Sequence, residues 1–181
     1  MTPTSFVTEP NMTQPADIAS DAQFVTLGID QEVFAVPVEA VVEILDMRPM
    51  FRLPDAPEFL AGLIDVRGRS VPVIDLRTKL GLPPQAATET TRILVLEIGM
   101  AAQTLVLGLV ADRVFEVLTL DRRQIEASPD IGVRWRSDYI SGVGRRQGGF
   151  VIIFNLPRLF SSSELMLVSA SAGREPMNLS A

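Results

Sequence analysis

The chain has 181 residues, of which 47% are hydrophobic, enough for one domain or two small, closely packed ones. It contains no cysteine and no histidine, which excludes disulfides, thiolate or imidazole metal sites and serine-histidine triads. The absence of cysteine suits a reducing cytoplasm. A net charge of −6 opposes binding to nucleic acid or to anionic membranes, so we expect no nucleic-acid partner and no membrane insertion.

Both ends of the chain lack hydrophobic periodicity. Residues 1–22 are rich in Thr, Pro, Ser and Asn, which predicts a disordered tail. They also lack the basic and apolar regions of a secretory signal. Residues 169–181 have a similar composition and predict a flexible tail.

The first half reads as short strands separated by turn signals. Proline at position 37 suits the start of a helical turn, and Pro57 suits the start of a short helix that ends at Gly62. Gly81 and two prolines end the half, and a polar loop follows at 83–91. The strands are expected at 24–29, 33–36, 43–47, 62–66 and 70–76.

The second half repeats this order. A final helix is expected over 156–167, because Asn155 is a suitable cap and Pro157 fits the first turn. The strands are expected at 93–98, 104–110, 139–144 and 150–155, with a turn and strand at 112–117.

Three blocks align between the halves in the same order. Residues 24–29 match 93–98 at an offset of 69, residues 34–45 match 107–118 at an offset of 73, and residues 62–76 match 142–156 at an offset of 80. Rising offsets are typical of a duplication with small loop insertions. Each unit offers about five short strands, and barrel closure protects exposed strand edges. We therefore predict two similar barrels side by side, at about 23–82 and 92–160.

Two patterns raise the alternative of an enzyme. Glu39 and Glu43, like Asp112 and Glu116, have the spacing that places carboxylates on one helix face for acid-base work. A solvated or partner-facing edge explains both pairs better, because no candidate nucleophile accompanies them. The glycines from Gly142 to Gly149 lack phosphate-loop spacing and are typical of a hairpin. We therefore expect no catalytic residue, no cofactor and no metal.

Arg67 stands before Gly68 at the connection between two predicted strands. A turn arginine is usually solvated, yet arginine is also enriched at interaction hot spots and the flanking residues are strongly apolar. The residues alone favour neither role.

The sequence around Arg67, from Ala61 to Arg77, resembles the signature of the CheW family of bacterial chemotaxis coupling proteins. The similarity covers about 23–167 and includes Pro54 to Phe59, Val41 to Ile44 and Val110 to Val117. Asp65-Val66 stands where the family usually has Asn-Leu, and Ala111 stands before Asp112, where the family usually has an apolar residue.

The resemblance implies an all-β domain at 23–168 with two five-stranded barrels of the Src-homology-three type and a C-terminal helix. It implies an adaptor that binds the cytoplasmic tips of chemoreceptors and the regulatory domain of a CheA-type histidine kinase, in the cytoplasm at receptor arrays. A scaffold for pilus motility or second-messenger control stays open as an alternative. The implied contact residues are Val41, Glu43, Gly62, Arg67, Gly68, Gly108 and Val117.

Overall fold

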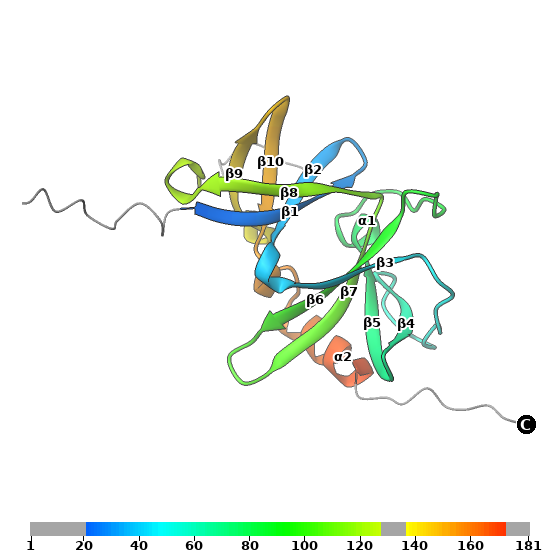
Figure 1. The fold of residues 1–181 in the computed structure, drawn as a ribbon. Coiled ribbons are helices and arrows are strands. Elements are labelled where there is room, and N and C mark those ends of the chain that lie inside the picture. Colours follow the sequence, from blue (N-terminus) through cyan, green and yellow to red (C-terminus); the bar gives the residue numbers. More distant parts are fainter. Residues whose placement is uncertain (1–20, 128–136, 173–181) are drawn as a thin grey trace, which may run out of the picture.

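The computed structural model describes residues 21–127 and 137–172, and these form two five-stranded sheets with a few short helices (Figure 1). One sheet, here called sheet A, has the strand order β8-β1-β2-β10-β9. Its strands are β1 (Asp21–Ile29), β2 (Glu32–Pro37), β8 (Arg113–Asp121), β9 (Ile140–Arg146) and β10 (Gly149–Phe154).

Sheet B has the order β3-β6-β7-β5-β4 and lies below sheet A in Figure 1. Its strands are β3 (Val41–Asp46), β4 (Leu60–Val66), β5 (Arg69–Asp75), β6 (Arg92–Gly99) and β7 (Thr104–Ala111). The all-β class and the two five-stranded units are therefore confirmed.

Each sheet contains strands from both halves of the chain. The prediction that residues 23–82 form one barrel and residues 92–160 the other is therefore wrong. Sheet A combines β1 and β2 of the first half with β8, β9 and β10 of the second, and sheet B combines the remaining strands. The physical reason lies in the two crossovers. After β2 the one-turn helix η1 (Val38–Ala40) leads into β3 of the other sheet, and Asp112 alone separates β7 from β8. The two repeats have thus exchanged strands.

The duplication is visible in the strand register. When residue numbers are shifted by the repeat offsets of 69, 73 and 80, the residue pairs of sheet A coincide with those of sheet B. The β-bulges fall at corresponding places in the two sheets. Three pairs of sheet A and their counterparts in sheet B are Val25–Val117 with Leu94–Ile44, Ala35–Ile153 with Gly108–Val73, and Ile140–Phe154 with Leu60–Ile74.

The chain closes each sheet across its open edges. The segment after β3 bridges back to β4 through Phe51 and Leu63, and the segment after β8 bridges to β9 through Glu126 and Val143. Pairing edge strands in this way removes unpaired backbone groups and gives each sheet the character of a small barrel.

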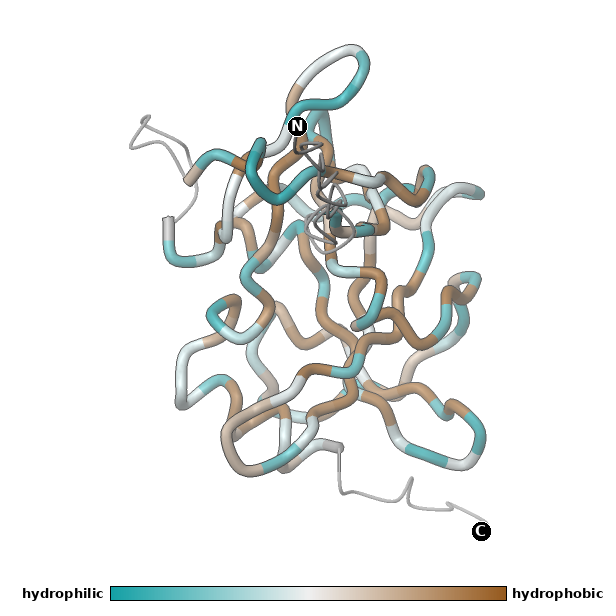
Figure 2. The backbone as a smooth tube through the Cα atoms, turned by 60° about the vertical axis from the view of Figure 1, so that its left-hand side comes forward, coloured by the Kyte–Doolittle hydropathy of each residue, from teal (hydrophilic) through white to brown (hydrophobic). Residues whose placement is uncertain are grey.

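Three hydrophobic clusters follow from this arrangement. A small cluster around Phe24 and Val151 fills sheet A, and another around Val73 and Ile93 fills sheet B. The largest cluster includes residues of both sheets, with Phe34 and Phe154 stacked 4.6 Å apart. Figure 2 shows the same distribution, with hydrophobic segments along the middle of the molecule and hydrophilic ones in the outer loops. The two barrels therefore share one continuous core.

The helices differ from the prediction at both ends of the domain. The expected helix at 156–167 is divided into η4 (Leu156–Arg158) and α2 (Ser162–Ala172). Helix α2 begins where Ser161 Oγ accepts from the Glu164 N–H and Glu164 Oε2 accepts from the Ser161 N–H, a reciprocal capping box. The helix extends into the predicted tail at 169–181, and β1 begins at Asp21 inside the predicted tail at 1–22. The rest of both tails lies outside the described residues.

Helix α2 packs against sheet B, with Val168 fully buried in the shared core, and it also contacts the only lysine of the chain. Lys79 is the last residue of α1 (Leu76–Lys79), and its side chain is only 5% exposed. Its Nζ donates to Glu164 Oε2 at 2.8 Å and lies 5.0–5.4 Å from the centroids of Phe59, Tyr139 and Phe160. The cation thus has a carboxylate and three aromatic rings as neighbours.

Candidate functional site

The strongest surface candidate lies at the edge of sheet B, where the tip of the β4–β5 hairpin meets β3. Arg67 Nη2 lies 3.8 Å from Glu43 Oε2, and the Arg67 side chain is 82% exposed. The structure therefore brings together two of the implied contact residues, Glu43 and Arg67, with Gly68 next to them in the turn.

The hairpin turn fixes the position of Arg67. Arg67 and Gly68 have φ angles of 54° and 81°, and they form a two-residue connection between β4 and β5. Positive φ at both positions matches the twist of a tight hairpin, but only glycine adopts it without steric cost. The Gly68 N–H donates to Asp65 Oδ1 at 2.8 Å and stabilises the turn. A bulky residue such as arginine is unusual in this conformation.

Strand β3 presents large apolar side chains beside this ion pair. Val42 and Ile44 are 56% and 44% exposed, whereas Val41 and Glu43, which alternate with them, are partly buried. Alternation is the expected result of the two-residue period of a strand. An edge strand with two exposed apolar residues is a surface suited to contact with another protein.

Unlike Arg67 and Gly68, the two implied contact residues Gly62 and Gly108 are buried. A Cβ at Gly62 would lie 2.7 Å from the Phe51 carbonyl oxygen, and one at Gly108 would lie 2.8 Å from Ile93 Cγ2. Gly62 permits the closing bridge of sheet B, and Gly108 permits close packing of β6 and β7. The geometry gives both glycines a packing role in the interior.

Val117 lies on β8, the edge strand of the other sheet. It is 54% exposed, and its neighbour on the same face, Phe115, is 45% exposed. At the offset of 73, Phe115 and Val117 are the counterparts of Val42 and Ile44. The family resemblance implied Val117 as a contact residue but not Phe115, Val42 or Ile44. The apolar alternation at 42–44 and 115–117 is a sequence signal that could have identified these three. The duplication has therefore produced two apolar edge strands, one on each sheet.

The two carboxylate pairs that the sequence offers for acid-base work do not lie on helix faces in the described residues. Glu39 lies in η1 and Glu43 in β3, and Asp112 precedes β8, so neither carboxylate pair shares a helix face as the spacing predicts. A groove of about 900 Å³ lies between the β3–β4 and α1–β6 loops. Two acids lining it, Asp75 and Asp112, already accept hydrogen bonds from other residues. Within 21–127 and 137–172, no three acidic side chains converge to hold a metal ion.

Residues 23–164 match the model of the CheW-like domain. The chain belongs to the CheW-like domain family. The match includes both sheets, the Arg67 hairpin and the first residues of α2. CheW-like domains are scaffolds of bacterial chemotaxis systems, so family membership favours a binding role.

Individual relatives agree with the family assignment. The chain is 31% identical over 146 residues to the chemotaxis protein CheW of Klebsiella aerogenes, covering 81% of this chain and 86% of the relative. It is 33% identical over 135 residues to the chemotaxis protein CheW of Rhizobium meliloti, covering 75% of this chain and 84% of the relative.

The fold is also similar to a crystal structure of the scaffolding protein TtCheW from Thermoanaerobacter tengcongensis. The TM-score is 0.70 at 26% sequence identity, and the similarity covers 86% of this chain and 97% of that protein. Among the described residues, no helix is long and apolar enough to cross a membrane.

Proposed function

We propose that the chain is a non-catalytic adaptor that couples chemoreceptors to a CheA-type histidine kinase in bacterial chemotaxis. The observation that carries this proposal is the presence of two equivalent apolar edge strands on opposite sheets, Val42 and Ile44 on β3 and Phe115 and Val117 on β8. An adaptor needs two separate surfaces, and the duplicated fold provides them. The names of the relatives supply the chemotaxis context.

The proposed partners are the cytoplasmic tip of a chemoreceptor and the regulatory domain of the kinase. The adaptor would work in the cytoplasm, recruited to receptor arrays at the inner membrane. Arg67 supports this role because a solvent-exposed guanidinium beside an apolar strand can make several hydrogen bonds to a partner. Phe115 and Val117 offer the second surface, with Arg146 lying 5.8 Å from the Phe115 ring centroid.

Two equivalent substitutions test the proposal. Ile44→Asp and Val117→Asp each place a charge in one apolar edge strand, and Thr104→Asp at the exposed start of β7, outside both edge strands, is the control. Binding to a purified receptor tip and to a kinase regulatory domain is measured by calorimetry, with circular dichroism to check folding. Each test variant should weaken at least one partner by about 30-fold, equivalent to about 2 kcal/mol, and the control should not. Wild-type binding of both partners by both test variants would refute the two-surface adaptor.

A further inference from the structure

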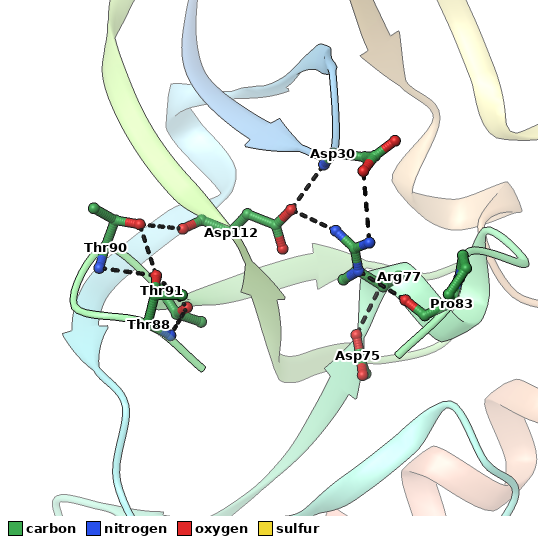
Figure 3. Close-up of polar contacts among 8 residues, drawn as sticks. All are labelled: Asp30, Asp75, Arg77, Pro83, Thr88, Thr90, Thr91 and Asp112. Carbon is green, nitrogen blue, oxygen red and sulfur yellow. Dashed lines mark hydrogen bonds and ion pairs between the residues drawn. The ribbon is translucent and has the colours of Figure 1, made fainter. Parts of the chain in front are cut away.

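Asp112 is the single residue between β7 of sheet B and β8 of sheet A, and its backbone N–H, its backbone carbonyl and one carboxylate oxygen all have hydrogen-bond partners. Its N–H donates to the Gly28 carbonyl at 3.0 Å, and its carbonyl accepts from Thr90 Oγ1 at 3.0 Å. Its Oδ2 accepts from the Asp30 N–H and from Arg77 Nη1, both at 2.7 Å (Figure 3). The crossover is therefore fixed to elements of both sheets.

Arg77 is the centre of this network. It lies in α1 directly after β5 of sheet B, and its side chain is only 11% exposed. The guanidinium reaches Asp112 at the crossover, Asp30 Oδ1 at 3.6 Å in the β1–β2 turn of sheet A, and the Pro83 carbonyl at 2.9 Å. Arginine suits this position because its planar guanidinium group can donate several hydrogen bonds in fixed directions at the same time. One side chain thus joins the turn of sheet A to the end of sheet B.

The duplicated fold contains a second crossover, and there the corresponding residues cannot form such a network. The repeat offsets identify the counterparts at this second crossover. Gly99 corresponds to Asp30, Pro157 to Arg77 and Glu39 to Asp112. Glycine and proline have no polar side-chain atom, and Glu39 is exposed in η1. A groove of about 310 Å³ lies at this place, lined by Pro37, Gly99, Asn155 and Pro157 among others. Among the residues that the structure describes, an arginine–aspartate network therefore joins the two barrels at the crossover after β7, and the corresponding residues at the crossover after β2 form none.

We propose that Arg77 is a positioning residue that sets the angle between the two barrels, and that the untied side opposite it is where this angle can change. The shared apolar core resists separation of the barrels but is not directional. The directional contacts between Asp30, Arg77 and Asp112 define the angle. Because β3 and β8 lie on different sheets, the same angle sets the relation between the two apolar edge strands. The inference concerns the fold and holds whichever partners bind.

The absence of cysteine makes a direct test simple, since spin labels can be attached to introduced cysteines alone. A label at Thr119 on β8 and one at Thr104 on β7 report on the distance between the sheets, and both residues are exposed. A pair at Thr104 and Arg69 lies within sheet B and serves as the internal control. Distance distributions are measured by pulsed electron paramagnetic resonance in the full-length protein.

Arg77→Gln should widen or shift the distribution between the sheets and leave the distribution within sheet B unchanged. Arg77→Lys, which keeps the charge but loses the fork of donors, should give an intermediate width. Arg92→Gln is the matched control, because Arg92 pairs with Asp46 at 3.3 Å inside sheet B. That variant should leave both distributions as in wild type.

Asp30→Asn provides a second test if Arg77→Gln does not fold. Asp30 has a φ of 56°, a conformation that asparagine tolerates, so the turn should persist while the ion pair is lost. A smaller widening in the same direction supports the inference. An unchanged distance between the sheets in the folded Arg77 or Asp30 variants, with only the melting temperature lowered, would overturn it, because the network would then add stability without setting the angle.

Discussion

Arg67 and Glu43 connect the two outer strands of sheet B, with Arg67 Nη2 3.8 Å from Glu43 Oε2. Glu43 lies on β3 and Arg67 follows β4, and these strands are at opposite ends of the sheet order. The arginine is 82% exposed, so water and salt screen the pair, and such pairs contribute at most about 1 kcal/mol. A left-handed backbone costs a non-glycine residue about as much. Stability therefore gives no reason for an arginine at position 67.

Arg67→Gly should separate binding from folding. Glycine relieves the left-handed backbone, so the melting temperature should stay the same or rise, whereas loss of a central interface arginine costs roughly 2 kcal/mol of binding, about 30-fold in affinity. Arg67→Ala should weaken binding equally without the gain in stability. Thermal denaturation and calorimetry with a receptor tip and a kinase regulatory domain measure the two effects.

Val73→Asp is the contrasting control, because Val73 is fully buried and a charge there should unfold the protein. If Arg67→Ala unfolds the chain as Val73→Asp does, the arginine is structural. If both Arg67 variants bind both partners like wild type, it is a solvated turn residue.

Gly108→Ala should destabilise the fold, because the added Cβ would lie 2.8 Å from Ile93 Cγ2. Overpacking of this kind costs about 1–3 kcal/mol. Gly99→Ala in the neighbouring strand is the control, since a Cβ there has no atom within 4 Å among the described residues. Urea unfolding should separate the two variants. A Gly108→Ala protein of wild-type stability that fails to bind would instead make Gly108 a contact residue.

The contact between Lys79 and Glu164 should hold α2 on sheet B. Lys79→Met leaves the Glu164 carboxylate without its cation, and Glu164→Gln leaves a buried ammonium without its anion, so each should cost up to about 3 kcal/mol. The double variant should lose less than the sum of the two. Urea unfolding of all four proteins gives the coupling directly, and a coupling near zero would show that the three aromatic rings hold the lysine alone.

Acid should weaken the same contact. Burial tends to raise the pKa of Glu164, but hydrogen bonds from Lys79 and Ser161 outweigh it and hold the pKa below its ordinary value of 4.5. Since the folded pKa is depressed, the stabilisation is complete above pH 4.5 and is lost as the pH falls through the folded value.

Urea unfolding from about pH 6 to about pH 3 measures this effect. Glu164→Gln should flatten the slope below the ordinary glutamate pKa. The pKa of Asp121, which hydrogen bonding to Arg123 lowers, is common to both proteins, so the difference between their curves isolates Glu164. Parallel curves for the two proteins would contradict the assignment.

Local patterns predicted much of the fold. Alternating apolar residues and turn glycines located most strands, and the collinear blocks at 24–29, 34–45 and 62–76 revealed a duplication that the register confirms. Local patterns could not predict which strands pair with each other, because strands of two repeats with the same apolar pattern can pair within one half of the chain or between the halves. The one-turn helix at 38–40 redirects the chain, and no local signal shows to which sheet.

Side chains that act over long sequence separations were missed for a related reason. Lys79 contacts Glu164, which is 85 residues away in the sequence, and no local pattern indicates that contact. Asp112 was interpreted as part of a solvated or partner-facing edge, yet its carboxylate accepts a hydrogen bond from Arg77 at a crossover between sheets. Arg67 was identified as a candidate because the sequence displays its two-residue turn directly and because the residues around it resemble the CheW signature.

The exchange of strands sets the order in which the protein can be completed during synthesis. Sheet B has its last strand once residue 111 has been made, whereas sheet A needs β10, which ends at Phe154. The first two strands to leave the ribosome, β1 and β2, must therefore wait for the last two before their barrel closes. Such distant pairings slow folding and leave apolar strands exposed meanwhile, which makes the nascent amino-terminal hairpin the part of this protein most in need of chaperone protection.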